Sequence, residues 1–171
     1  MDFKNLIRNI PDFPIPGIQF KDITTVLKDA AGLNAAINEM SDFLKDITFD
    51  AVIGPESRGF IFGVPMALNM QKGFIPARKP KKLPAQTISK TYDLEYGKNT
   101  IEIHKDALAP GQRVVIADDL LATGGTCKAV CELVQEAGAK VVAIVFFIEL
   151  SGLKGRDELE KFCPVFSVVE Y

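Results

Sequence analysis

The chain has 171 residues, with 20 Lys and Arg against 22 Asp and Glu and a single His, so its formal net charge is −2. Hydrophobic residues make up 47 % and charged residues 25 %, a composition typical of a single globular domain. A mildly acidic chain lacks the net basic surface needed to bind bulk nucleic acid or an anionic membrane, so we expect neither partner. The average hides one local cluster, because Arg78, Lys79, Lys81 and Lys82 fall within five positions.

The chain start and the cysteines favour a cytoplasmic protein. Residues 1–16 mix charges and prolines and lack the apolar segment of a signal peptide. The longest apolar run, 141–148, is much shorter than the about 20 residues of a membrane-spanning helix. Three cysteines, Cys127, Cys131 and Cys163, show no CxxC spacing, and we interpret them as reduced packing thiols.

The first part of the chain predicts an irregular segment, a helix, a strand and a second helix. Three prolines and a glycine within residues 11–17 indicate a stiff, irregular connection. Asp29 is a suitable N-cap for a helix over residues 30–44. The β-branched apolar run 51–53 predicts a strand covered on both faces, and a glycine-containing turn leads from it into a helix over 59–69.

The middle of the chain does not follow this alternation. The basic stretch 78–91 contains two prolines and almost no apolar periodicity, so we expect a long loop or arm there. After it, residues 92–96 and 100–104 flank Gly97-Lys98-Asn99 and resemble an antiparallel hairpin.

The last part returns to alternating strands and helices. The apolar run 114–117 predicts a second buried strand, residues 125–137 have helical periodicity, and 141–148 predict a third strand. Strands that alternate with helices predict an α/β fold with a mainly parallel central sheet and flanking helices.

The most informative stretch runs from Val114 to Thr126 and reads VVIADDLLATGGT. It places two aspartates at the carboxyl end of a buried strand, the edge at which open α/β sheets bind ligands. The small residues after them let the backbone approach a ligand, and the helix that follows has free N–H groups at its positive end, where a phosphate fits. The stretch lacks the lysine of a Walker A loop.

The two aspartates of this stretch would repel a phosphate if they touched it. They should therefore meet another part of the same ligand, and vicinal ribose hydroxyls or a bound Mg²⁺ are suitable. The alternative is a solvated turn in which Asp118 or Asp119 only caps backbone groups. The Thr-Gly-Gly-Thr turn that follows favours a ribose-phosphate ligand.

This stretch resembles the phosphoribosyl pyrophosphate signature of type I phosphoribosyltransferases. The chain is similar to adenine-specific members of that family over nearly its whole length, from Phe13-Pro14-Ile15-Pro16-Gly17 to Leu153-Lys154-Gly155-Arg156. The resemblance implies one domain over 1–171, with a small N-terminal hood over 1–28 and a flexible arm and hairpin over 78–104. It also implies a homodimer that converts adenine and phosphoribosyl pyrophosphate to AMP and pyrophosphate in purine salvage, with Mg²⁺ as cofactor.

The resemblance assigns a set of residues to each part of the substrates. The ribose hydroxyls and 5′-phosphate would be held by Asp118, Asp119, Ala122, Thr123, Gly124, Gly125 and Thr126. The pyrophosphate would be held by Glu56, Ser57, Arg58, Arg78, Lys79 and Lys82. The adenine would be held by Ile18, Phe20, Lys21 and Leu150. Glu95 would be the catalytic acid or base, and Mg²⁺ would be carried mainly by substrate oxygens and water rather than by protein ligands.

Purely structural interpretations of single residues remain as alternatives to these roles. Arg58 could be an ordinary surface base, although a cation is unfavourable at the positive end of a helix, which favours a function. Phe20 and Leu150 could simply pack in the core. Enzymes for 6-oxopurines usually have an Asp where this chain has Ala122, and that Asp assists proton transfer on the base. In this chain another group must assist that transfer, and Glu95 is the candidate.

Three other functions remain as alternatives, of which the last is a generic nucleotide-binding α/β module that only the acidic pair and the loop after it argue against. The first is the same transfer to hypoxanthine, guanine or xanthine. The second is a regulator that binds phosphoribosyl pyrophosphate without turnover, but such regulators usually add a DNA-binding domain. The residues before the first predicted core strand show neither a helix-turn-helix pattern nor a basic face.

Overall fold

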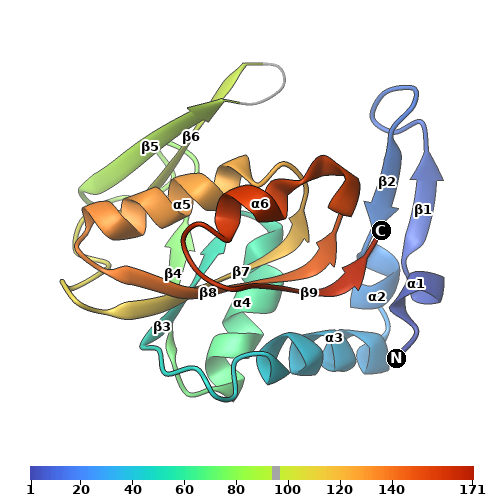
Figure 1. Cartoon of the computed structure of the whole chain (residues 1–171), viewed down its shortest axis with the longest axis horizontal. Helices are drawn as coiled ribbons and strands as arrows, with labels where there is room; N and C mark the ends of the chain where they lie inside the picture. Colours follow the sequence, from blue (N-terminus) through green and yellow to red (C-terminus); the bar gives the residue numbers. More distant parts are fainter. Residues whose placement is uncertain (94–96) are drawn as a thin grey trace.

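Five parallel strands form the central sheet of the computed structural model, which describes residues 1–93 and 97–171 (Figure 1). Their order is β4-β3-β7-β8-β9. The strands are β3 (Ala51–Pro55), β4 (Gly73–Ala77), β7 (Arg113–Leu121), β8 (Lys140–Glu149) and β9 (Val165–Glu170). The three strands predicted from apolar runs are confirmed as β3, β7 and β8, and they lie together in the middle of the sheet. The edge strands β4 and β9 are only partly buried and lack such runs.

Helices cover both faces of this sheet, as predicted for an α/β fold. One face carries α3 (Ala30–Asp42) and α4 (Arg58–Asn69), and the other carries α5 (Gly125–Glu136) and the short α6 (Gly155–Leu159) (Figure 1). Asp29 caps α3 by accepting a hydrogen bond from the Gly32 N–H at 2.5 Å, as predicted. Three short helical segments complete the described residues: α1 (Phe3–Leu6), α2 (Thr24–Leu27) and η1 (Ser151–Leu153). None of the helices in these two ranges is long and apolar enough to cross a bilayer.

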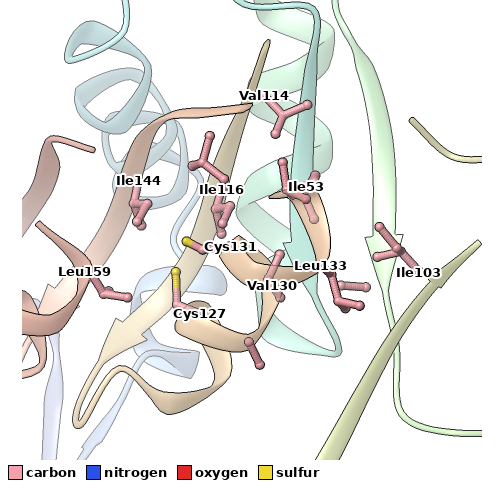
Figure 2. Close-up of a cluster of buried hydrophobic side chains, with 14 of the residues drawn as sticks. Ile53, Ile103, Val114, Ile116, Cys127, Val130, Cys131, Leu133, Ile144 and Leu159 are labelled. Atoms are coloured by element: carbon pink, nitrogen blue, oxygen red, sulfur yellow. The ribbon is translucent and has the colours of Figure 1, made fainter. Parts of the chain in front are cut away.

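The core is divided by the sheet into two layers. In the layer under α5, Val130 and Leu133 of the helix pack against Ile116 and Ile144 of the strands (Figure 2). Cys127 and Cys131 lie in the same layer, and all three cysteines are free. The thiols are therefore packing groups, as the sequence indicates, and α5 is fixed on the sheet by an apolar face of its own.

An antiparallel hairpin of β5 (Thr87–Asp93) and β6 (Lys98–His104) stands beside α5 (Figure 1). The hairpin was predicted, but the irregular arm expected over 78–91 is wrong for residues 87–91, which belong to β5. Ile88 and Tyr92, four residues apart on one face of β5, pack against the core layer under α5, which explains the strand. The prolines and lysines earlier in the stretch conceal this alternation.

A second hairpin, of β1 (Arg8–Pro11) and β2 (Gln19–Asp22), lies at the opposite side of the molecule (Figure 1). The irregular connection predicted over 11–17 is largely confirmed, except that Pro11 is paired with Gln19 at the end of β1. Arg8 closes the base of the hairpin through a bidentate hydrogen bond to Asp22 Oδ2, with distances of 2.9 and 2.6 Å.

Candidate active site

A cavity of about 310 Å³ lies at the carboxyl ends of β3 and β7. Its walls are residues 55–58, which lead from β3 into α4, residues 118–127, which lead from β7 into α5, and Phe146. The two loops that the sequence singled out separately thus form one site. They meet because β3 and β7 are parallel neighbours, so both end at the same edge of the sheet.

The loop after β7 has the form of an anion-binding site. Gly124, the N-cap of α5, has φ 82°, a left-handed conformation that favours glycine. The first helical hydrogen bond within α5 runs from the Lys128 N–H to the Gly124 carbonyl at 2.9 Å. The preceding N–H groups at the start of the helix have no intrahelical acceptor, and they lie at its positive end in the cavity wall.

This loop rests directly on the backbone of the first turn of α6. A Cβ on Gly155 would lie 2.2 Å from the Ala122 carbonyl oxygen, and a Cβ on Gly124 would lie 3.0 Å from the Gly155 carbonyl oxygen. Neither position has room for a side chain. The shape of the loop is therefore set in part by α6, an element that the sequence pattern did not predict.

Behind this contact, Arg156 of α6 pairs with the buried carboxylate of Glu149, which is 4 % exposed at the end of β8. Arg156 Nε donates to Glu149 Oε1 at 3.0 Å, and Nη1 donates to the Val165 carbonyl at 2.6 Å. The Ser167 hydroxyl donates to Glu149 Oε2 at 2.6 Å. This network fixes α6, and with it Gly155, against the end of the sheet.

The acidic pair at the end of β7 is held in an unusual electrostatic state. Asp118 Oδ1 accepts the Asp119 N–H at 2.8 Å, and Asp119 is 4 % exposed. Asp119 Oδ2 lies 2.9 Å from Arg58 Nε but makes no hydrogen bond in the described residues. Burial, helped by the charge of Asp119, raises the pKa of Asp118 well above its usual range. Burial also raises the pKa of Asp119, although the charge of Arg58 opposes it. Asp119 Oδ2, although ion-paired with Arg58, thus retains the capacity to accept a hydrogen bond from a ligand.

Asp118→Asn should stabilise the fold by about 0.5–2 kcal/mol near neutral pH. The raised pKa means that ionisation of Asp118 costs stability, and this cost falls as pH drops through the folded-state pKa. Asparagine removes the charge but keeps the Oδ1 acceptor for the Asp119 N–H. Thermal unfolding should give a higher Tm for the variant at about pH 7 and a smaller difference at about pH 5. Asp46→Asn at an exposed position is the control, and an equal gain there would contradict this account.

The predicted basic residues lie at and beside the cavity. Arg58 begins α4 and lines the cavity, with Ser57 as the N-cap before it. Glu56 links this loop to the basic segment, because its Oε1 accepts the Lys79 N–H at 2.6 Å and lies 3.3 Å from Arg78 Nε. Arg78 is half-buried, whereas Lys79 and Lys82 are exposed. These three residues are therefore neighbours of the cavity rather than part of its wall.

The candidate base-binding residues are outside the cavity wall as well. Phe20 on β2 lies beside a residue of the cavity wall, since the guanidinium carbon of Arg58 lies 6.0 Å from the centre of its ring. The Leu150 N–H donates to the Leu121 carbonyl at 2.9 Å, which places Leu150 beside the end of β7. Lys21 Nζ lies 3.9 Å above the ring of Tyr171, and Ile18 is exposed. The structure thus places Phe20 and Leu150 next to residues of the cavity wall, whereas Lys21 contacts Tyr171 and Ile18 is exposed.

Within residues 1–93 and 97–171, no group of three His, Cys, Asp or Glu side chains is arranged to hold a metal ion. The cavity offers the carboxylates of Asp118, Asp119 and Glu56, and Glu56 is engaged by the basic segment. A hard cation such as Mg²⁺ prefers about six oxygen ligands. It fits this cavity only if a ligand molecule and water supply most of them.

One predicted residue cannot be placed, and two contacts were missed. Glu95, the predicted acid or base, lies outside the described residues. Tyr92 reaches the loop over residues 122–126, the candidate phosphate loop, since the Thr126 hydroxyl donates to its Oη at 2.9 Å. Its spacing from Ile88 on one strand face could have indicated an inward position. The contact of Gly155 with Ala122 has no such signal, because it depends on how distant segments meet.

The comparisons with known proteins agree on one family. A sequence model of the phosphoribosyl transferase domain matches residues 18–169. The adenine phosphoribosyltransferase of Clostridium perfringens is 56 % identical over 171 residues, which cover 100 % of this chain and 99 % of that protein.

Two solved structures are similar over nearly the whole chain. That of adenine phosphoribosyltransferase from Thermoanaerobacter pseudethanolicus has a TM-score of 0.95 and 51 % identity, covering 98 % of this chain and 97 % of the other. That of the Giardia lamblia enzyme complexed with 9-deazaadenine has a TM-score of 0.93 and 41 % identity, covering 99 % and 96 %.

Proposed function

The chain belongs to the phosphoribosyl transferase family, and on that premise we propose that it transfers the 5-phosphoribosyl group from phosphoribosyl pyrophosphate to adenine, giving AMP and pyrophosphate for purine salvage. One observation carries this proposal. The cavity joins an acidic pair at the end of β7, of which Asp119 is buried, to an anion-binding loop at the start of α5. A ribose 5-phosphate has hydroxyls for the first and a phosphate for the second, at the two ends of one small molecule.

The ribosyl donor would be held by charges of both signs. The loop over residues 122–126 would bind the 5′-phosphate through backbone N–H groups and the hydroxyls of Thr123 and Thr126. Asp118 and Asp119 would accept hydrogen bonds from the 2′ and 3′ hydroxyls, a role supported by Asp119 Oδ2, which accepts no hydrogen bond within the described residues.

The pyrophosphate would lie against the loop after β3. Glu56, Ser57 and Arg58 belong to that loop, and Arg78, Lys79 and Lys82 lie beside it. The Arg58 guanidinium pairs with Asp119, with 2.9 Å between Nε and Oδ2. A bound pyrophosphate would offer it stronger, bidentate partners, and the Arg58 cation would then stabilise the negative charge that develops on the leaving group. We expect the Mg²⁺ to arrive as part of this substrate, held mainly by pyrophosphate and water oxygens.

Adenine would enter from the side of β2. The Phe20 ring would stack on the purine opposite Arg58, with Ile18, Lys21 and Leu150 around it. This places N9 of the base to attack the anomeric carbon as pyrophosphate leaves from the other face, with inversion. Holding both reactants in this order supplies much of the rate enhancement. Glu95 would manage the proton on the purine ring, an assignment that rests on the sequence.

Incubation with adenine, phosphoribosyl pyrophosphate and Mg²⁺ tests this function directly. AMP and pyrophosphate should form in equal amounts, and hypoxanthine, guanine and xanthine should be much poorer acceptors. The Asp118→Asn/Asp119→Asn double variant controls for a contaminating enzyme. Preference for another purine would reassign the acceptor. Binding of phosphoribosyl pyrophosphate without turnover of any purine would favour the non-catalytic regulator.

We also propose a homodimer in the cytoplasm. Val64 and Leu68 lie one turn apart on α4 and are exposed, the latter by 72 %, which supports an apolar contact between two copies. Three free cysteines suit a reducing compartment. Light scattering after gel filtration should give twice the chain mass, and Leu68→Glu should shift it toward the monomer.

A further inference from the structure

Tyr92 of β5 contacts the phosphate loop, although it belongs to neither sequence motif of the site. The Thr126 hydroxyl donates to Tyr92 Oη at 2.9 Å, and Thr126 is part of the cavity wall. We propose that Tyr92 is a positioning residue that orients the Thr126 hydroxyl toward the 5′-phosphate. This inference rests on the proposed function, since it assumes that a phosphate binds at the loop.

The arrangement of protons gives Tyr92 this role. A threonine hydroxyl has one proton and two acceptor lone pairs, and the Thr126 hydroxyl donates its proton to Tyr92 Oη. A phosphate only accepts hydrogen bonds, so Thr126 must turn its proton to the phosphate to bind it. The Tyr92 hydroxyl would then turn its own proton toward a lone pair of Thr126 Oγ1. The result is a chain in which Tyr92 donates to Thr126 and Thr126 donates to the charged phosphate, and each hydrogen bond strengthens the other.

The position of Tyr92 is fixed by packing that is independent of this hydrogen bond. Its ring and the aliphatic side chain of Ile88, on the same face of β5, pack against the core layer under α5. Between them in sequence, Lys90 Nζ lies 3.1 Å from Glu132 Oε2 of α5, which ties the same strand to the helix (Figure 1). The Tyr92 hydroxyl is thus held in place before a substrate arrives, so little entropy is lost when the hydroxyl chain forms.

Tyr92→Phe removes only the hydroxyl and keeps the packed ring, so it isolates this role. We expect the affinity for AMP to fall about five- to tenfold and the KM for phosphoribosyl pyrophosphate to rise by a similar factor, whereas the KM for adenine stays within about twofold. Calorimetric titration with AMP and initial-rate kinetics measure these quantities. Adenosine, which lacks the phosphate, should compete equally well with both proteins.

Thr91→Val is the matched control. It removes the Thr91–Thr100 hydroxyl contact of 2.9 Å from the same hairpin, one residue away and outside the cavity wall, and should leave all of these values unchanged. Thr126→Val tests the route of the effect, since adding Tyr92→Phe to it should cause no further loss of AMP affinity.

The outcomes separate the inference from the proposed function. Wild-type protein that neither binds AMP nor turns over adenine would overturn the function. If the wild type is active, three results would each overturn the role of Tyr92: unchanged AMP affinity in Tyr92→Phe, an equal rise in both KM values, or additive losses in the Thr126→Val background.

Discussion

Gly155→Ala should lower kcat/KM for phosphoribosyl pyrophosphate by about 100-fold, because the added methyl group has no space. Its Cβ would lie 2.2 Å from the Ala122 carbonyl oxygen and 2.9 Å from the Thr123 carbonyl carbon. These are backbone atoms of the phosphate loop, so the loop itself must shift. A displacement of about 1 Å in a binding loop is enough for a loss of this size. Steady-state kinetics with varied phosphoribosyl pyrophosphate measure the effect, and adenine binding should change less.

Gly152→Ala is the matched control for this prediction. Gly152 lies three residues earlier, in η1, and a Cβ there would have no atom within 4 Å. Both variants therefore replace a glycine by alanine in a helical segment, and only in Gly155→Ala does the added Cβ clash with the loop. Equal kinetic losses in the two variants, or none in Gly155→Ala, would show that the loop does not depend on α6.

Arg156→Met should destabilise the fold by about 3 kcal/mol near neutral pH, since it leaves the buried Glu149 carboxylate without its partner. In the wild type, burial acts to raise the pKa of Glu149, but the hydrogen bonds from Arg156 and Ser167 and the charge of Arg156 outweigh it and lower the pKa. The stabilisation this provides is present above the ordinary glutamate pKa and is lost as pH falls through the lowered one. Urea unfolding followed by circular dichroism measures the difference.

The dependence on pH distinguishes a lost ion pair from a lost packing contact. In Arg156→Met, burial raises the pKa of Glu149 without the opposing charge of the guanidinium. The variant therefore gains stability when the Glu149 carboxyl is protonated. The gap to the wild type should therefore be smaller at about pH 5 than at about pH 7. Glu149→Gln in the variant background should recover part of the loss. Lys161→Met, which breaks an exposed pair with Glu158, should destabilise the fold much less than Arg156→Met does. A gap that is constant with pH would contradict this account.

The elements that could be predicted are those whose own residues decide their structure. The runs in β3, β7 and β8 are apolar without alternation because both faces of these strands are covered, and Asp29 caps α3 by a contact three residues away. The start of β5 was missed because its inward residues, Ile88 and Tyr92, are few and follow a basic stretch with two prolines. Its conformation depends on α5, with which it packs.

The same distinction holds for the candidate site. The acidic pair and the phosphate loop are contiguous, so the sequence displays them as one motif at the end of one strand. The pairing of Arg58 with Asp119 depends instead on the order of strands in the sheet, and the contact of Gly155 with Ala122 depends on where α6 lies. Such contacts depend on the topology of the fold, and no local sequence pattern predicts them.

The alkylation rate of a buried thiol of α5 can be used to measure motions that open the site. Cys127 lies in the cavity wall and is 3 % exposed, and burial raises its pKa well above the usual value, so little reactive thiolate is present. Alkylation of Cys127 must then wait for α5 to lift or for the loop to open, and its rate measures how often this happens. Cys163, only half-buried, reports separately on the surface beyond α6. The slowing of Cys127 labelling by each substrate would therefore record, without any engineered probe, how firmly that substrate closes the phosphate loop.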